Sequence, residues 1–575
     1  MTLKRVLIGV AAGLVGLYLV LAAVVYFDPS SKVRYDQADA KVIDFTYGNG
    51  LGPHERDAFY HLSQGSEILP IRWLRAIEDP ATNRPFMENL ERFGLLPDPT
   101  RNDGLAVGMT LSEGDKPILG QYAGITCAAC HVAEFRYNGK GVRVDGAANM
   151  FDMQAYYEAM LRSAQATLQD PRRLDRVVKR LIRQDLDRYG VFAPVMRVWF
   201  WIRGGAKAEE LKNDLKARIQ LLKVIQQAIA MREAGAKPGE VTTSGFGRLD
   251  AFNGTRNFLL GRISAKNIVP LAAPVKFPPI WGFHDYEWIE WTQNTNSILE
   301  RNVTETLGAG ATVKVEPGWG PRRFESSVPV ANLHRLETAA YQLQPPKWPS
   351  ALFGAPDPTA AGRGQAVFAK TCAGCHEYGP KDRTATGLLS LHVFSPAQIG
   401  VDPSTAQQVA RPVADTGDLP MDGSRSFAKA VAFVVGAVRD KAYEREHIAP
   451  DAQAVMEDRA RRGGVYWRDT LPDTGKPYAS RPLHGVWAMA PYLHNGSVPT
   501  LYDMLQPPAA RPKVFPIGQR DYDPAKVGFR TDIPDAQVKY RVDVSKPGSA
   551  NTGHPFGTTL PEADKRDLLE YLKTY

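Results

Sequence analysis

Four cysteines, all placed in two Cys-x-x-Cys-His pentads, constrain this 575-residue chain more than any other feature. Two thiols three positions apart lie on one helical turn, where each can form a thioether to the edge of a porphyrin, and the adjacent histidine can bind its iron. A thioredoxin-like redox pair does not need the histidine, and a zinc site needs further cysteine or histidine ligands nearby. The sequence therefore predicts two covalently bound haem c groups. The residues predicted to hold them are Cys127, Cys130 and His131 in the first pentad and Cys372, Cys375 and His376 in the second.

The N-terminal segment predicts a membrane anchor. Lys4 and Arg5 precede a largely apolar run from Val6 to Phe27, which would span about 33 Å as a helix, enough to cross a bilayer. The run contains no clear small-residue cleavage site, which favours a retained anchor over a signal peptide. Basic residues before the run place the N-terminus in the cytoplasm. We therefore expect a single-pass protein of the inner membrane with its haem domains in the periplasm.

The charge balance bears on the partners. The formal net charge is +8, but the sequence has no long run of lysine and arginine, so nucleic-acid binding is not expected. A basic face can dock an acidic protein. The expected partner is a protein that donates or accepts electrons, with a small-molecule oxidant as a further candidate.

The two pentads begin 245 residues apart, which predicts a separate cytochrome c-like domain for each. A proline-rich linker at 345–358 separates a first haem domain, residues 29–345, from a second, residues 346–575, and residues 1–28 form the anchor. Helical spacing predicts a helical insertion at about 154–235 in the first domain. The expected fold class is mainly α, with two haem domains, long loops, this insertion and one transmembrane helix.

The C-terminal segment predicts a closing helix. Leu568, Leu569 and Leu572 recur at helical spacing, Thr559 can cap the helix, and Pro561 suits its first turn. A cytochrome c domain normally ends with a helix that packs on its opening helix. An ordinary amphipathic terminal helix would have the same pattern.

Longer motifs around the pentads resemble a known family. Residues 122–131 (YAGITCAACH) and 142–146 (VRVDG), with Phe277–Trp281 and Arg301–Gly308, resemble the first haem domain of RoxA-like dihaem proteins. Residues 481–501, which contain RPLHGVW and APYLHNGSVPTL, resemble the second. The broader relatives are dihaem cytochrome c peroxidases and MauG-like enzymes. The resemblance implies unequal haems, with one iron closed by a second axial ligand and the other open to peroxide or dioxygen.

The resemblance also implies a distal ligand for the second haem. His554, in a Gly-His pair, matches a motif that the RoxA-like group places there. His494 lies in the Pro-Tyr-Leu-His motif, where the peroxidases keep a histidine beside the haem. Met504 lies where the peroxidases keep a methionine ligand, although the spacing differs. His554 is favoured, and the other two stay open.

Glu305 is the candidate acid/base at the first haem, because splitting an oxygen–oxygen bond needs a group that moves a proton. The alternative is a solvated residue or an ion-pair partner of Arg301. Rubber oxygenases have an aromatic-lined distal pocket, but the five residues after Leu307 are Gly-Ala-Gly-Ala-Thr, which argues against polyisoprene cleavage. A tryptophan often relays electrons between the two haems in this superfamily. Three tryptophans qualify by position, although such a cluster is also typical of a core: Trp281, Trp288 and Trp291.

These observations favour a haem oxidoreductase that uses peroxide or dioxygen at the His131 haem and relays electrons through the His376 haem. One alternative is a non-catalytic electron-transfer cytochrome that serves a membrane or periplasmic dehydrogenase. Another is an oxygenase for a hydrophobic substrate.

Overall fold

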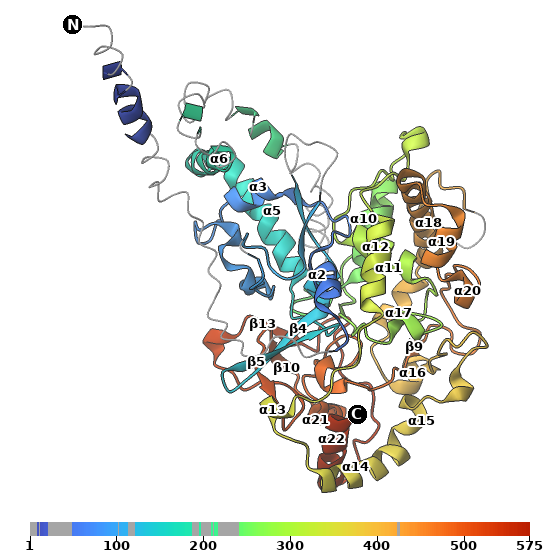
Figure 1. Ribbon diagram of the computed structural model, residues 1–575. Coiled ribbons are helices and arrows are strands. Elements are labelled where there is room, and N and C mark those ends of the chain that lie inside the picture. Colours follow the sequence, from blue (N-terminus) through green and yellow to red (C-terminus); the bar gives the residue numbers. More distant parts are fainter. Residues whose placement is uncertain are drawn as a thin grey trace.

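The computed structural model in Figure 1 describes residues 9–10, 12–20, 49–101, 103–112, 121–186, 192, 195–196, 209–210, 212–216, 241–421 and 426–575. In this part of the chain, helices are joined by long loops and by short antiparallel strand pairs. Figure 1 shows three groups of helices. They are α3 (Ile71–Ala76), α5 (Met153–Gln169) and α6 (Pro171–Leu186); α10 (Ala251–Ile263), α11 (Ile298–Gly308), α12 (Val330–Ala340) and α18 (Phe427–Glu446); and α14 (Pro358–Thr371) with α22 (Glu562–Thr574).

The predicted transmembrane helix is a point of correction. Within the residues that the structure describes, no helix is long and apolar enough to cross a membrane. Of the apolar run Val6–Phe27, residues 9–10 and 12–20 are helical, and the remainder lies outside the described residues. A helix needs about 20 apolar residues to cross a bilayer, which these segments do not reach. The inner-membrane location and the periplasmic orientation depended on that helix and stay predictions.

The mainly α class needs a second correction, because the first pentad lies among strands. The pentad helix α4 (Cys127–His131) follows β3 (Tyr122–Ile125), which pairs with β1 (Leu69–Pro70) and β2 (Met109–Ser112). After the pentad, β4 (Val132–Tyr137) and β5 (Lys140–Asp145) form an antiparallel hairpin. Asn138 and Gly139 at its turn have φ values of 49° and 74°. Both positive values suit a type I′ turn, so this Asn-Gly pair is the sequence signal for the hairpin.

The predicted helical insertion is described in its first part, as α5 and α6. Asp152 caps α5 by accepting a hydrogen bond from the Ala155 amide at 2.9 Å. Next to α3, the fully buried carboxylate of Glu78 pairs with Arg176 at 2.6 Å and Arg180 at 2.7 Å, which attaches α6. Most of the predicted insertion after residue 186 lies outside the described residues.

The helices α10, α11, α12 and α18 pack around an apolar core. Leu299, Val303 and Leu307 recur every four residues along α11 and are buried there. That spacing places them on one face of the helix. Because Arg301 and Glu305 fall between them, they project from a different face, toward the site described below.

The opening and closing helices of the C-terminal part pack closely against each other. Gly364 of α14 lies against α22, where a Cβ atom would be 2.0 Å from the Asp567 carbonyl oxygen. Arg363 and Asp567 form an ion pair at 2.6 Å across the same contact. Helix α22 begins after Pro561 with no side-chain cap, so the predicted cap by Thr559 is wrong. Since α14 leads directly into Cys372, this helix pair positions the second pentad.

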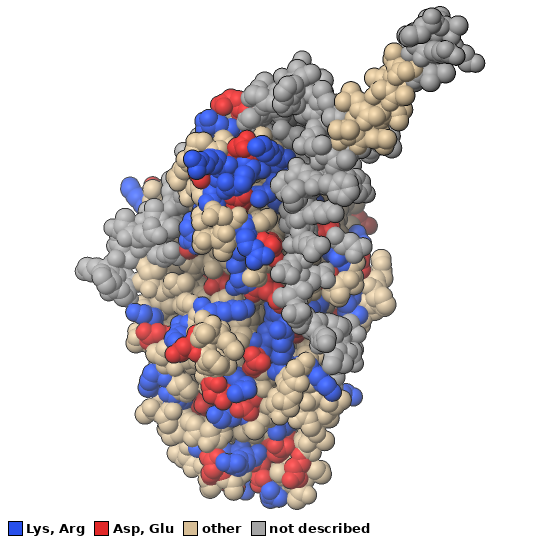
Figure 2. All heavy atoms as spheres, turned by 90° about the vertical axis from the view of Figure 1, so that its left-hand side faces the viewer, with Lys and Arg blue, Asp and Glu red and all other residues tan. Residues whose placement is uncertain are grey.

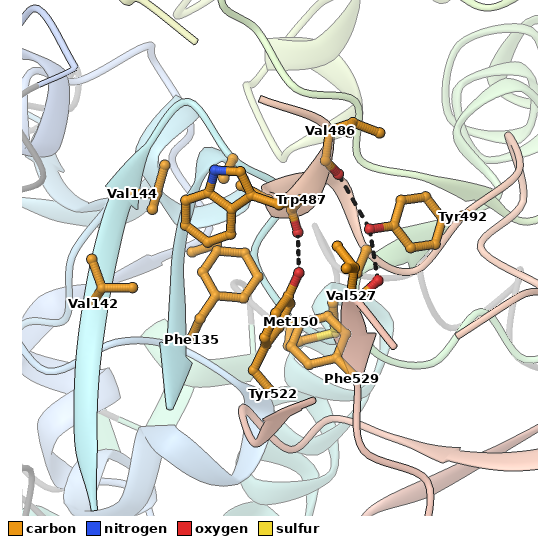
Figure 3. Close-up of a cluster of buried hydrophobic side chains, with 14 of the residues drawn as sticks. Phe135, Val142, Val144, Met150, Val486, Trp487, Tyr492, Tyr522, Val527 and Phe529 are labelled. Carbon is orange, nitrogen blue, oxygen red and sulfur yellow. Dashed lines mark hydrogen bonds between the residues drawn. The ribbon is translucent and has the colours of Figure 1, made fainter. Parts of the chain in front are cut away.

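One buried cluster joins the hairpin after the first pentad to the C-terminal part of the chain (Figure 3). The Phe135 ring of β4 lies 5.3 Å from that of Trp487 and 5.5 Å from that of Tyr522. The Tyr522 hydroxyl donates to the Trp487 carbonyl at 2.8 Å. The residues on either side of the predicted boundary at 345 therefore share a core, and the division into two domains stays a prediction.

The remaining elements are short. They are α2 (Pro53–His61), η2 (Phe86–Phe93), β6 (Arg248–Leu249), η5 (Ala265–Asn267), β7 (Val275–Lys276), η6 (Phe283–Asp285), η7 (Gly320–Arg322), α13 (Ser350–Phe353), α15 (Ala373–His376), η8 (Pro380–Asp382), β8 (Val393–Phe394), α16 (Pro396–Ile399), α17 (Ser404–Val409), α19 (Pro450–Met456), α20 (Arg459–Arg462), β9 (Tyr478–Ala479), η9 (Val486–Met489), α21 (Leu501–Met504), η10 (Pro508–Ala510), β10 (Val514–Ile517), β11 (Tyr522–Asp523), β12 (Gly528–Phe529), η11 (Asp535–Gln537) and β13 (Tyr540–Asp543). On the face shown in Figure 2, basic and acidic side chains are intermingled. That face is therefore not a single basic surface.

Candidate haem sites

The first pentad occupies one helical turn that the following loop fixes in place. The Gly146 amide donates to the His131 carbonyl at 2.7 Å, and the Asn149 amide donates to the Cys130 carbonyl at 2.9 Å. The buried His131 ring contacts the Pro278 carbonyl through Nδ1 at 3.0 Å, which leaves Nε2 for a metal. Burial lowers the pKa of His131 to about 3, so the imidazole is neutral, as a metal ligand must be.

A cavity of about 560 Å³ adjoins this pentad. Cys127, Cys130 and His131 line it, and α11 contributes Arg301 and Glu305 to its wall. His131 is the single histidine among the described residues that line it. The volume falls in the range of about 300–1,000 Å³ that is typical of sites for small molecules and cofactors.

The carboxylate of Glu305 faces this cavity and is held by Arg301. Arg301 also donates to Glu290 at 2.6 Å, so one guanidinium lies between two carboxylates. Desolvation by the surrounding protein raises the pKa of Glu305 to about 7, although 41% of its side chain stays exposed at the cavity; Arg301 opposes the rise and the charge of Glu290 adds to it. Such a carboxyl group can both accept and donate a proton near neutral pH. The predicted ion pair with Arg301 is present, and it does not exclude the acid/base role, which stays a prediction.

The second pentad continues from α14 into α15. The His376 ring contacts the Arg481 carbonyl through Nδ1 at 2.8 Å, which again leaves Nε2 for a metal. The ring of His554 lies opposite, with the two ring centres 6.2 Å apart. Imidazole–metal bonds of about 2 Å on both sides of one metal would put the ring centres roughly 6 Å apart. The two histidines are therefore spaced to bind one iron from both sides.

The loop that carries His554 is held by a residue that sequence reasoning missed. The buried guanidinium of Arg511 donates to the carbonyls of Gly553 at 2.6 Å and His554 at 3.0 Å. A Cβ atom on Gly553 would lie 2.3 Å from a side-chain carbon of Val401, so only glycine fits. His554 itself has a φ of 56°, and its amide donates to the Ile399 carbonyl at 2.8 Å. The close packing of this loop therefore requires the glycine before His554.

The other two candidate ligands have different surroundings. His494 is buried and its ring lies 4.3 Å from that of Tyr478. Met504 is buried in the apolar cluster of the C-terminal part. Of the three candidates, His554 is the one that the structure brings into ring contact with His376.

The three candidate tryptophans occupy different places. Trp291 lines the cavity and also packs against the small apolar cluster of Val401, Ala406 and Tyr478. Val401 contacts the loop of His554, so Trp291 reaches from the first site toward the second. Trp281 is buried and donates to the His484 carbonyl at 3.1 Å, while Trp288 lies under Arg468 at 3.6 Å. Neither of these two lines the cavity.

Sequence reasoning also missed the aromatic wall of the cavity. The segment after Leu307 borders the cavity without an aromatic residue, as predicted. However, Phe252 and Phe258 of α10 and Phe427 of α18 line the same cavity. These residues lie far from Leu307 in the sequence and are brought together only by the packing of the helices.

These features fit haem c. Each pentad combines two thiols with a histidine whose Nδ1 is fixed by a carbonyl, and the first adjoins a cavity of suitable size. Buried nitrogens without a hydrogen-bond partner, Nε and Nη2 of Arg481 and Nε1 of Trp291, indicate that a further group belongs beside them. The residues that would hold the haems are Cys127, Cys130 and His131 at one site and Cys372, Cys375, His376 and His554 at the other.

Comparison with known proteins supports this interpretation. A family model described as RoxA-like, cytochrome c-like matches residues 477–516, which include the carbonyl partner of His376. Protein y4iJ of Sinorhizobium fredii strain NGR234 is 31% identical over 582 aligned residues, which cover 90% of this chain and 91% of the relative. The chain belongs to the y4iJ family. Protein y4iM of the same strain is 28% identical over 59% of this chain and 72% of its own length. Both relatives are named as uncharacterized proteins, so the cytochrome assignment depends on the RoxA-like match, which implies haem c.

Proposed function

We propose that the chain is a dihaem c-type oxidoreductase that uses peroxide or dioxygen at the His131 site and takes electrons through the His376 site. The observation that carries the proposal is the difference between the two sites. His376 faces His554 at 6.2 Å, whereas His131 faces a cavity with Glu305 on its wall. An iron held on both sides transfers electrons without rearrangement, while chemistry on oxygen needs an open position.

A haem c at His131 would supply an iron with a position for an oxygen ligand. The protein contributes the proton transfer. Glu305, with a pKa of about 7, accepts a proton from one oxygen atom and returns it to the other, which helps the oxygen–oxygen bond to break. Arg301 keeps the carboxylate turned toward the cavity by its ion pair. The apolar side chains of Phe252 and Phe258 line the same space.

Electrons would come from a partner protein through the His376 site. Of the three tryptophans, Trp291 is the relay that we propose, because it lines the first cavity and packs against the cluster beside the His554 loop. An aromatic ring between two redox groups shortens the distance that an electron has to cross in one step. The face in Figure 2 carries charges of both signs, so it does not favour an acidic partner over a basic one.

Turnover of hydrogen peroxide with a reduced donor tests the proposal. We expect Glu305→Gln to lower the rate by about 10²- to 10⁴-fold, because removing a general acid/base has an effect of that size. Glu337→Gln is the matched control, since Glu337 is a buried carboxylate on the neighbouring helix α12 that does not line the cavity. Equal rates in both variants and the wild type would exclude Glu305 from the reaction.

An oxygenase for a hydrophobic substrate is a second candidate, favoured by the aromatic wall of Phe252, Phe258 and Phe427. Dioxygen consumption would then depend on an apolar substrate and not on an external electron donor. Consumption that requires the donor and ignores apolar compounds would leave the first proposal standing.

A further inference from the structure

The two sites are joined by a short chain of backbone groups that passes through Arg481. The Arg481 carbonyl accepts the Nδ1 hydrogen bond of His376. The guanidinium of the same residue donates to the Pro279 carbonyl at 3.4 Å. Pro278, the preceding residue, carries the carbonyl that contacts His131. One residue therefore touches both of the segments that fix the proximal histidines.

Arg481 exposes only 7% of its surface, and its guanidinium is poorly satisfied, because two of its nitrogens, Nε and Nη2, have no hydrogen-bond partner. Among the described residues, no carboxylate pairs with it. Arg511, which exposes only 2% of its surface, donates instead to several backbone carbonyls. A buried cation without a partner is costly, so a missing anion is expected beside Arg481.

The position of the guanidinium points to the source of that anion. It lies 4.3 Å from the centre of the Trp291 ring, and Trp291 lines the cavity beside the first pentad. Haem c carries two propionate carboxylates, which are not consumed by the thioether bonds. A planar guanidinium with two free N–H groups is suited to bind a carboxylate.

We propose that Arg481 is a positioning residue that binds a haem propionate at the junction of the two sites and thereby sets the haem potential. This inference depends on the presence of haem in the proposed function, but not on turnover of peroxide. The positive charge of the Arg481 guanidinium favours the reduced form of the iron, so its removal lowers the midpoint potential of the haem. The Arg481 carbonyl is part of the main chain and remains in any substitution.

The test uses the haem-loaded protein and two readouts that do not depend on activity. We expect Arg481→Met to shift the propionate bending band in the resonance Raman spectrum. We also expect at least one haem to become tenfold easier to oxidise at a fixed mediator potential, a shift of about 59 mV for one electron. Arg468→Met is the control. Arg468 also lies over a tryptophan, Trp288, at 3.6 Å, but neither Arg468 nor Trp288 lines the cavity.

Arg481→Lys decides the question where Arg481→Met fails to take up haem. Lysine keeps the charge but not the fork of donors, so the potential should stay within a tenfold change while the propionate band shifts. Unchanged bands and potentials in the loaded variant would overturn the proposal. If the wild-type protein shows no peroxide turnover while the Arg481→Met variant still shifts both readouts, the proposed function is refuted and this inference stands.

Discussion

Replacement of Gly364 by alanine should disturb the second haem site through the contact between α14 and α22. The added Cβ atom would lie 2.0 Å from the Asp567 carbonyl oxygen and 2.9 Å from the Tyr571 Cβ atom. The backbone of α22 cannot rotate away as a side chain can, so the two helices have to separate. Overpacking of this kind costs about 1–3 kcal/mol. Alanine favours the helix over glycine by about 1 kcal/mol, which offsets part of the loss.

Gly362 provides the matched control in the same helix. It is exposed, and a Cβ atom there would have no neighbour within 4 Å. Gly362→Ala should therefore gain the helix propensity of about 1 kcal/mol without the clash. The difference between the two variants isolates the clash, and we expect Gly364→Ala to be the less stable by about 1–3 kcal/mol.

Thermal unfolding of the haem-loaded protein, followed at the Soret band, measures this difference. For a cooperative unit of about 150–250 residues, such as the predicted second domain, 1 kcal/mol corresponds to a shift of roughly 2–4 °C in the unfolding midpoint. The midpoints of the two variants should therefore differ by at least about 2 °C. The Soret band reports the surroundings of both haems, including the one at the second pentad, which follows α14 directly. A Gly364→Ala variant as stable as Gly362→Ala would refute the reasoning that the helices touch at this glycine.

Four further predictions concern single residues. His554→Ala should open the second iron, so that carbon monoxide binds all the haem of the reduced protein. Tyr522→Phe should lower the free energy of unfolding by about 1 kcal/mol in chemical denaturation, because it removes the buried hydrogen bond to Trp487. The pH–rate profile should rise with pH through about 7, since Glu305 must be ionised to accept a proton, and Glu305→Gln should lack this limb. The pKa of Glu78 is lowered on folding, because its arginine partners outweigh the burial that would raise it. The carboxylate therefore stabilises the fold above its unfolded pKa, and this stabilisation is lost as the pH falls through its folded pKa. Glu78→Gln should weaken the dependence of the melting temperature on acid pH.

The sequence predicted the features whose chemistry is local. Each pentad holds its cysteines and histidine within one helical turn, so spacing alone identifies it. Leu568, Leu569 and Leu572 predicted the closing helix, because an apolar face repeats every three or four residues. The Asn138-Gly139 pair is also a local signal for a hairpin turn, but the strands on either side of it were not predicted.

The features that depend on contacts between distant segments could not be predicted. Arg511 holds the His554 loop through carbonyl groups 40 to 43 positions away, and nothing in the residues around it indicates this. The aromatic wall combines Phe252 with Phe427, which meet only when α10 packs on α18. The apolar run at the N-terminus suggested a spanning helix from composition, and the described helices do not provide one.

An optical titration of the dithionite-reduced, haem-loaded protein with carbon monoxide tests the central claim most directly. The claim is that one iron is open at His131 and the other is closed between His376 and His554. Half of the haem should change to the spectrum of the carbon monoxide complex. Absence of any change would mean that both irons are closed, which would contradict the proposed oxygen chemistry and favour an electron carrier.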